Sequence, residues 1–344
     1  MQITIGKTGI TVEKNGFGAL PVQRVDKGEA VKLLRRAYDG GFQYFDTARN
    51  YTDSEEKLGE AFSHMRDQVV IATKTGAADG DGVRRDLETS LRNLRTDHID
   101  IYQFHNPRTC PAPDDGTGRY EAALEAQAAG KIRFISITSH RLDVATEAIA
   151  SGNFATLQYP FNYLSTEKEI AIMRAAVDAG MGFFAMKGLS GGLINNSAAA
   201  AAWMELFPQV VPLWGIQREH ELDEFLAHIQ NPPTLTQELQ AVIDRDRAQL
   251  QGEFCRSCGY CMPCPQGIVI NQAARMSLLL RRAPVSSNLN DAGIAMMKKI
   301  EDCRGCRSCA DKCPYGLDTP ALLRRNYKDY MEILAGKPIL PDNF

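Results

Sequence analysis

The sequence lacks several features that would define its class at once. It has no excess of basic residues, because 39 lysines and arginines stand against 42 acidic residues, for a net charge of −3. Proteins that bind DNA or an acidic membrane surface carry basic patches, so we expect neither partner here. No stretch approaches 18 consecutive apolar residues, and the N-terminus shows no charged leader before an apolar run, so we expect a cytoplasmic protein.

Cysteine is nearly absent from the first 254 residues, which contain only Cys110, whereas eight cysteines follow in two compact groups. With 344 residues, the chain is also more than twice as long as a typical domain of ~150 residues. The rhythm of apolar segments breaks near Asn231, and a polar helical stretch over 237–251 leads into the cysteine region. We therefore predict two domains, residues 1–235 and 236–344.

Short apolar runs alternate with amphipathic stretches throughout the first domain. Eight runs have the length and composition of strands: 16–20, 42–48, 69–75, 99–105, 132–138, 156–161, 182–187 and 211–216. The segments between them have helical periodicity, and the strands are continuously apolar, as buried parallel strands are. Eight such units predict a (β/α)8 barrel, a TIM barrel. Two β-branched runs around a glycine turn in residues 2–12 predict an N-terminal hairpin before it.

Barrels of this kind place their chemistry at the carboxyl ends of the strands, where four polar residues stand. Asp46 ends the second predicted strand, and Tyr51 follows in the next loop. Lys74 and His105 end the third and fourth strands. We expect an Asp46–Lys74 ion pair, because a charge buried alone is costly. The ammonium would lower the pKa of the Tyr51 hydroxyl and make it a proton donor, while His105 holds a substrate carbonyl oxygen.

These residues resemble the catalytic tetrad of the aldo-keto reductases: an Asp, a Tyr five residues later, a Lys and a His. The resemblance covers about residues 1–230 and implies that Asp46, Tyr51, Lys74 and His105 are catalytic. It also implies hydride exchange between NADP or NAD and a small carbonyl or alcohol substrate. By position, the implied cofactor contacts are Gly18, Ala19, Asp46, Thr138, Ser139, Gln158, Met186, Lys187, Gly188, Leu189, Gly215, Gln217 and Arg218.

Two positions depart from the pattern of many family members. Met186 stands where an aromatic ring often stacks on the nicotinamide, and it supplies an apolar contact instead. After the eighth strand, Gly215 and Glu221 replace a Lys and an Arg that grip the 2′-phosphate of NADP. Arg218 is able to substitute, whereas Glu221 would repel the phosphate. The choice between NADP and NAD therefore stays open.

The two cysteine groups have the spacing of iron–sulfur ligands. The second group is a full bacterial-ferredoxin run, followed by proline, in which the fourth cysteine ligates the other cluster. Its members are Cys303, Cys306, Cys309 and Cys313. The first group, with two residues rather than three before its last member, is Cys255, Cys258, Cys261 and Cys264. Two zinc sites are the rival interpretation, because pairs with C-x2-C spacing also suit zinc.

The ferredoxin pattern implies two 4Fe-4S clusters. One takes Cys255, Cys258, Cys261 and Cys313, and the other takes Cys264, Cys303, Cys306 and Cys309. Helical stretches expected at 271–282 and 288–300 make the module resemble an α-helical ferredoxin, which accompanies the barrel in one subfamily of aldo-keto reductases. A ferredoxin or flavoprotein is then the expected redox partner. The alternative is an iron–sulfur electron-transfer or redox-sensing protein whose barrel docks a partner or ligand, because hydride chemistry needs no cluster.

Overall fold

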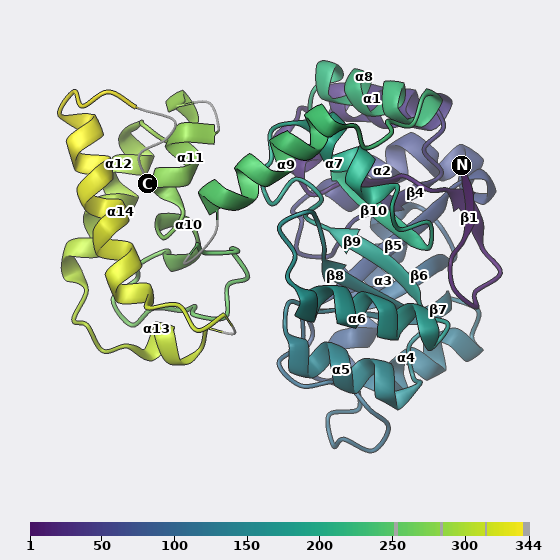
Figure 1. Cartoon of the computed structure of the whole chain (residues 1–344). Helices are drawn as coiled ribbons and strands as arrows, with labels where there is room; N and C mark the ends of the chain where they lie inside the picture. Colours follow the sequence, from purple (N-terminus) through teal and green to yellow (C-terminus); the bar gives the residue numbers. More distant parts are fainter. Residues whose placement is uncertain (251–253, 283–284, 314, 340–344) are drawn as a thin grey trace. The chain divides into compact units, whose positions relative to one another are not determined.

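The computed structural model describes residues 1–250, 254–282, 285–313 and 315–339 (Figure 1). The chain divides into two compact units. The first consists of Met1–Gly188 and Ala200–Leu235, and the second of Leu189–Ala199 and Thr236–Phe344. The short segment Leu189–Ala199 groups with the second unit, which the sequence did not indicate. Within the described ranges, no helix is long and apolar enough to cross a membrane.

Eight parallel strands of the first unit close into a barrel, which confirms the predicted fold (Figure 1). They are β3 (Gly16–Gly18), β4 (Tyr44–Asp46), β5 (Val70–Thr75), β6 (Ile99–His105), β7 (Ile132–Thr138), β8 (Thr156–Pro160), β9 (Gly182–Met186) and β10 (Val210–Gly215). The strands pair in chain order, and β10 closes on β3. All eight predicted strands are confirmed, with ends within two residues of the prediction.

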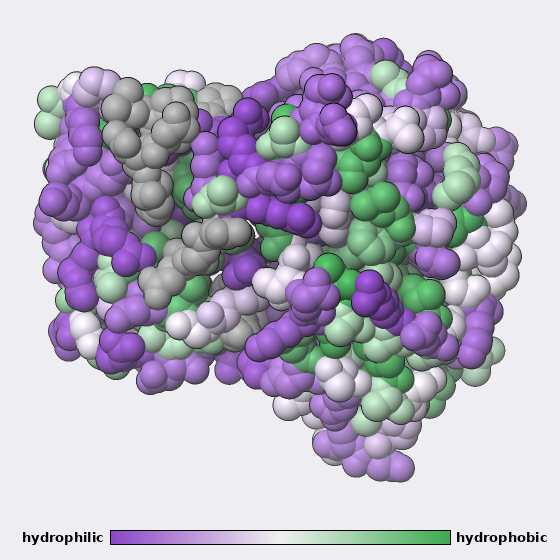
Figure 2. All heavy atoms as spheres, viewed as in Figure 1, coloured by the Kyte–Doolittle hydropathy of each residue, from purple (hydrophilic) through white to green (hydrophobic). Residues whose placement is uncertain are grey.

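Helices follow the strands and cover the outside of the barrel. They are α1 (Lys27–Asp39), α2 (Ser54–Phe62), α3 (Gly80–Leu94), α4 (Arg119–Ala128), α5 (Leu142–Ser151), α6 (Glu167–Asp178), α7 (Ser197–Met204) and α8 (Glu219–Gln230). In α1, Ala30, Leu33, Leu34 and Ala37 are buried, which is the spacing of one helix face. The opposite faces of α1 and α8 are mostly hydrophilic (Figure 2).

A hairpin precedes the barrel, as the sequence predicted. Its strands β1 (Gln2–Thr4) and β2 (Thr11–Glu13) pair in antiparallel fashion. Ile3 and Val12 on the hairpin join a buried cluster with Tyr44 and Val211, which lie near the starts of their barrel strands. The hairpin therefore covers the amino ends of the strands and leaves their carboxyl ends for the chemistry.

The second unit is helical. Its helices are α9 (Gln237–Leu250), α10 (Ile270–Ala273), α11 (Met276–Arg282), α12 (Asp291–Lys298), α13 (Ser308–Asp311) and α14 (Thr319–Leu334). The helix predicted over 237–251 is observed as α9, and its last predicted residue, Gln251, lies outside the described residues. The stretch predicted over 288–300 contains α12 and the start of a 3-10 turn, Lys299–Asp302.

The prediction of one helix over 271–282 is wrong, because the structure breaks it between α10 and α11. The side chain of Asn326 on α14 accepts a hydrogen bond from the backbone N–H of Ser277 at 2.9 Å. This tertiary contact satisfies a backbone donor that a continuous helix would have paired internally. Residues 274–275 thereby stand outside both helices.

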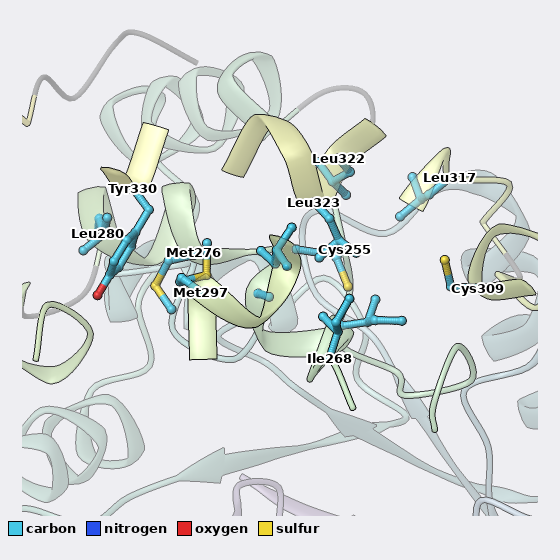
Figure 3. Close-up of a cluster of buried hydrophobic side chains, with 14 of the residues drawn as sticks. Cys255, Ile268, Met276, Leu280, Met297, Cys309, Leu317, Leu322, Leu323 and Tyr330 are labelled. Atoms are coloured by element: carbon cyan, nitrogen blue, oxygen red, sulfur yellow. The ribbon is translucent and has the colours of Figure 1, made fainter. Parts of the chain in front are cut away.

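Apolar side chains from α10 to α14 and the segments beside them form one core (Figure 3). Cys255 lies inside it, with its sulfur near Leu323 and Ile268. Cys309 and Leu317 stand at the right edge of the labelled group, opposite Tyr330 and Leu280. Two of the predicted ligands, Cys255 and Cys309, are therefore buried in this core, whereas Cys306 is exposed.

Candidate active site and cysteine cavities

The predicted ion pair lies at the centre of the barrel's carboxyl end. Lys74 Nζ lies 2.6 Å from Asp46 Oδ1, and the two side chains are 1% and 5% exposed. The ammonium also donates to the carbonyl oxygen of Thr47 at 2.6 Å. On the other side, Gln103 Nε2 donates to Asp46 Oδ2 at 3.0 Å. Each charge thus has an opposite charge and a further hydrogen bond, which is what a buried pair requires.

Tyr51 and His105 lie beside this pair. The two rings meet edge to face, with centroids 5.7 Å apart. Lys74 Nζ is 5.1 Å from the centroid of the Tyr51 ring. A turn after β4, in which the Tyr51 N–H donates to the carbonyl of Ala48, carries the tyrosine to this position. The structure therefore brings the four predicted catalytic residues together.

The expected direction of the Tyr51 pKa is wrong. Burial raises the pKa of the hydroxyl, Lys74 lowers it by a smaller amount, and Asp46 adds to the increase. An ammonium alone would lower this pKa, but the cost of burying a phenolate and the charge of the paired carboxylate both act in the opposite direction. Tyr51 is consequently protonated at neutral pH, which is the form that donates a proton.

Burial and the Lys74 charge lower the pKa of His105 to about 3. The ring is therefore neutral at physiological pH and carries one N–H. Its Nδ1 atom is buried and has no hydrogen-bond partner among the described residues. A neutral imidazole next to a tyrosine hydroxyl suits the predicted role of holding a substrate oxygen.

Sequence reasoning missed two polar residues of this site, Gln103 and His140. Strand alternation gives the signal for Gln103, because it lies two residues before His105 and therefore on the same face of β6. His140 directly follows Ser139 after β7. Burial, Lys187 and His105 lower its pKa well below the usual value, and its Nδ1 is buried without a partner among the described residues. Two neutral histidines thus lie in this part of the barrel.

The three residues expected to hold the carboxamide lie at the ends of β7 and β8. Gln158 Nε2 is 3.4 Å from Asp46 Oδ1, and its Oε1 is buried with no partner within the described residues. Thr138 Oγ1 accepts a backbone N–H from the loop after β6 at 2.9 Å. The Ser139 hydroxyl accepts a backbone N–H two residues further on at 2.9 Å. Of the three, Gln158 keeps an acceptor available.

Gly18, Ala19 and Gly215 lie where β3 and β10 meet. Gly18 and Gly215 are direct partners in the parallel ladder. The N–H of Ala19 donates to the carbonyl of Asp46 at 2.8 Å, which ties this corner to the ion pair. These positions lie near the ion pair, and their roles as cofactor contacts stay predictions.

Met186, Lys187, Gly188 and Leu189 follow one another at the end of β9. Lys187 has a positive φ of 59°. A Cβ at Gly188 would lie 2.6 Å from the Trp214 ring, so packing alone requires glycine there. Leu189 is the first residue of the segment that groups with the second unit.

The residues after β10 form a capped helix start. Glu221 Oε2 accepts the backbone N–H of Gln217 at 2.9 Å and that of Arg218 at 3.1 Å. Arg218 Nη1 also lies 3.6 Å from Glu221 Oε1. A carboxylate therefore occupies the N-terminus of α8, where a bound phosphate would otherwise gain from the exposed N–H groups.

The eight predicted ligands line two cavities in the second unit. Cys255, Cys258 and Cys313 line the first, Cys264, Cys303, Cys306 and Cys309 line the second, and Cys261 borders both. The proline that follows Cys313 lies outside the described residues. Among those that are described, no three cysteine, histidine or carboxylate side chains are placed to share a single metal ion. In type and number, the thiols around each cavity fit a 4Fe-4S cluster.

Comparison with known proteins agrees with both halves of this description. The family model of the aldo/keto reductases matches residues 12–229, well over half of the chain. The chain belongs to the aldo-keto reductase family. A model described as a 4Fe-4S dicluster domain matches residues 254–318. The protein is thus an oxidoreductase of the aldo-keto reductase family that carries a 4Fe-4S domain.

Individual relatives cover the barrel. Aldo-keto reductase YhdN of Bacillus subtilis is 31% identical over 194 residues, which is 51% of this chain and 58% of the relative. The holo form of an aldo-keto reductase from Bacillus halodurans superposes with a TM-score of 0.63 at 20% identity, covering 71% of this chain and 95% of that one. An aldo-keto reductase from Klebsiella pneumoniae, solved with NADPH, gives 0.62 at 22% identity, covering 73% and 97%. The structural matches establish the fold.

Proposed function

We propose that the barrel interconverts a small aldehyde or ketone and the corresponding alcohol, with NAD or NADP as hydride carrier. The observation that carries this proposal is the buried Asp46–Lys74 pair, which lies beside a protonated Tyr51 and a neutral His105. Family membership supports the reaction class. The name of a relative from Papaver somniferum, NADPH-dependent codeinone reductase, supports a nicotinamide cofactor.

The chain's own residues account for the proton. In the reductive direction, the nicotinamide supplies a hydride to the carbonyl carbon when it is bound. Tyr51 gives its hydroxyl proton to the oxygen, and the adjacent Lys74 ammonium stabilises the phenolate that remains. The His105 N–H orients the oxygen. Asp46 keeps the ammonium in place, and hydride and proton together complete the alcohol.

Several described residues support the proposed cofactor contacts. Gln158 supports a carboxamide site because its buried Oε1 is open to an amide N–H. By resemblance to the family, Met186 would contact the face of the nicotinamide, and the residues from Lys187 to Leu189 would lie along the pyrophosphate. Glu221 occupies the helix start that a 2′-phosphate would approach, so we propose that it weakens NADP binding relative to NAD.

The second unit is proposed to hold two 4Fe-4S clusters. The cavity linings support the predicted sets, with Cys313 beside the first group and Cys264 beside the second. Such clusters exchange single electrons, so the expected partner is a ferredoxin or a flavoprotein. Thiolate ligands persist in a reducing compartment, so we propose a cytoplasmic location.

One experiment tests both halves. The protein is purified without oxygen, iron and sulfide are measured, and NADH and NADPH are titrated while nicotinamide fluorescence is followed. About eight irons per chain and saturable binding of either nucleotide support the proposal. Absence of nucleotide binding would overturn the hydride mechanism and favour an electron-transfer or redox-sensing protein. Stoichiometric zinc in place of iron and sulfide would overturn the cluster assignment.

A further inference from the structure

Arg275 is a buried cation in the break between α10 and α11. Arg275 is only 7% exposed. Nη2 donates to the carbonyl oxygens of Ser190 at 2.9 Å and Gly191 at 3.2 Å. Its Nε–H is buried and has no hydrogen-bond partner in the part of the chain that the structure describes. Nη2 thus holds the segment Leu189–Ala199 through two hydrogen bonds, while the Nε–H donor is unpaired among the described residues.

No carboxylate in the described parts of the chain balances this charge. Among the described residues, no ion pair to Asp or Glu involves Arg275, whereas its neighbours Arg281 and Arg282 pair with Asp329 and Asp246. Cys255 lies next to the same break: its Sγ is 4.0 Å from the carbonyl oxygen of Asn271 on α10, and it shares the buried core with Ala274. A buried cation without a counter-charge is costly, so the anionic partner is expected on the side of Cys255.

The backbone of Ser190–Gly192 has a conformation that lets the guanidinium of Arg275 approach closely. Ser190, Gly191 and Gly192 all have positive φ values, of 50°, 63° and 88°. A positive φ at serine is uncommon and persists where the surroundings hold it. A Cβ at Gly191 would lie 3.2 Å from Arg275 Nη1, a tight contact that shows how closely the guanidinium approaches this backbone. In sequence, this segment directly follows Lys187 and Gly188.

We propose that Arg275 is the counter-charge of the cluster bound through Cys255, and that it links this cluster's charge to the position of the loop at Ser190 and Gly191. The inference rests on the proposed clusters and on the proposed nucleotide contact at Lys187–Leu189. Coupling between two sites is reciprocal. Nucleotide binding therefore shifts the reduction potential of this cluster, and reduction of the cluster changes nucleotide affinity.

The test is a redox titration of the loaded full-length protein with dithionite, followed by electron paramagnetic resonance. In Arg275→Gln, the reduced and more negative form loses a stabilising charge. We expect the reduction equilibrium constant of one cluster to fall about tenfold, which is ~59 mV for one electron, while the other stays unchanged. NADPH added to the wild-type protein shifts the same cluster.

Hydrogen exchange of the segment 189–199 gives a second readout. Arg282 is the matched control, because its Nη1 donates to the Leu193 carbonyl at 2.7 Å in the same segment, while its charge is paired with Asp246. Arg282→Gln should speed exchange without moving either potential. Arg281→Gln, whose partner Asp329 lies elsewhere, should change neither. Arg275→Lys, which keeps the charge but not the fork of donors, should speed exchange and retain the potential.

The outcomes separate this inference from the proposed function. Wild-type protein that takes up no iron and sulfide overturns both. Loaded protein whose potentials are the same in wild type and Arg275→Gln overturns the inference and leaves the clusters in place. If Arg275→Gln does not bind iron and sulfide, Arg275→Lys is measured instead. Hydrogen exchange at the wild-type rate in the segment 189–199 of that variant would contradict the proposed role of the Arg275 hydrogen bonds.

Discussion

The two units of this protein place their reactive groups in opposite kinds of surroundings. In the barrel, the Asp46 carboxylate has an ammonium and an amide as partners, and the Lys74 ammonium has a carboxylate and a carbonyl. In the second unit, Cys255 and Cys309 lie among apolar side chains, and the Arg275 cation lacks a carboxylate partner within the described residues. In the barrel, protein groups therefore balance the charges of the site, whereas among the described residues of the second unit no carboxylate balances Arg275.

This difference has a physical consequence for each unit. A site whose charges are matched by protein groups is organised before its ligand arrives, so its substitutions should change chemistry more than folding. A site of thiols inside a hydrophobic core couples folding to the metal, since binding free energy becomes folding free energy. The experiments below test this contrast.

The largest effect is expected from Tyr51→Phe. The substitution removes the proton donor and keeps the ring, so carbonyl reduction should fall by about 10²–10⁴-fold in kcat. Steady-state reduction of aldehyde and ketone panels with NADH and NADPH measures it, with iron content and nucleotide affinity as controls that should not change. Tyr38→Phe is the matched variant, because its hydroxyl bonds only the exposed Gln68 side chain among the described partners. Activity of Tyr51→Phe at the wild-type level would contradict the assigned acid.

The next largest effect is expected from removal of iron, which should unfold the second unit and leave the barrel folded. The chain's only two tryptophans, Trp203 and Trp214, belong to the barrel unit, so their fluorescence reports its unfolding alone. Chelation without oxygen should unfold the second unit, seen as lost helical circular dichroism, and leave the tryptophan transition in place. A second unit that keeps its helices without iron would show that its apolar core suffices by itself.

A smaller effect is expected from pH. The pKa of His105 is lowered to about 3 in the folded barrel, below its usual value near 6.5. Between these values the unfolded state binds more protons, so barrel stability should fall as the pH drops from about 6.5 towards 3. Urea unfolding followed by tryptophan fluorescence at pH 7 and pH 5 measures the slope. In His105→Gln, which cannot titrate there, the loss should be smaller, and an equal loss would exclude His105 as its source.

The contrast between the units also explains what the sequence could predict. Strand number and order follow from local apolar runs, so all eight barrel strands were found to within two residues. The ion pair followed from the cost of burying Asp46 and Lys74 apart. The predicted direction of the Tyr51 pKa was wrong because it depends on how deeply the ring is buried, which the positions of Tyr51 and Lys74 in the sequence do not give.

In the second unit, tertiary contacts determine more of the local structure. The run 271–282 has helical composition throughout, and its break depends on Asn326, almost fifty residues later. The carbonyl partners of Arg275 lie even further away in sequence, more than eighty residues before it, so the sequence presents it as one arginine among several. Cysteine spacing predicts ligands, but the position of Arg275 and the grouping of Leu189–Ala199 with the second unit require the fold.

The smallest effect is expected from Glu221, whose charge lies at the edge of the barrel site and is proposed to weaken the binding of NADPH. Glu221→Gln keeps an amide oxygen for the N–H groups of Gln217 and Arg218, as a glutamine does in a capping box, and removes only the charge. Arg218 then loses its ion-pair partner and is available to a 2′-phosphate. Since partly exposed charges contribute at most about 1 kcal/mol, we expect NADPH to bind about fivefold more tightly, with NADH unchanged.

Fluorescence titration of both nucleotides measures this change, and Glu224→Gln is the matched control because it removes one charge further along α8. Equal gains for NADPH in both variants would indicate a general effect of net charge. A gain for NADH as large as that for NADPH in Glu221→Gln would show that the carboxylate acts on the shared part of the nucleotide rather than on the 2′-phosphate. A gain confined to NADPH and to Glu221→Gln places the choice between the two nucleotides in this one carboxylate.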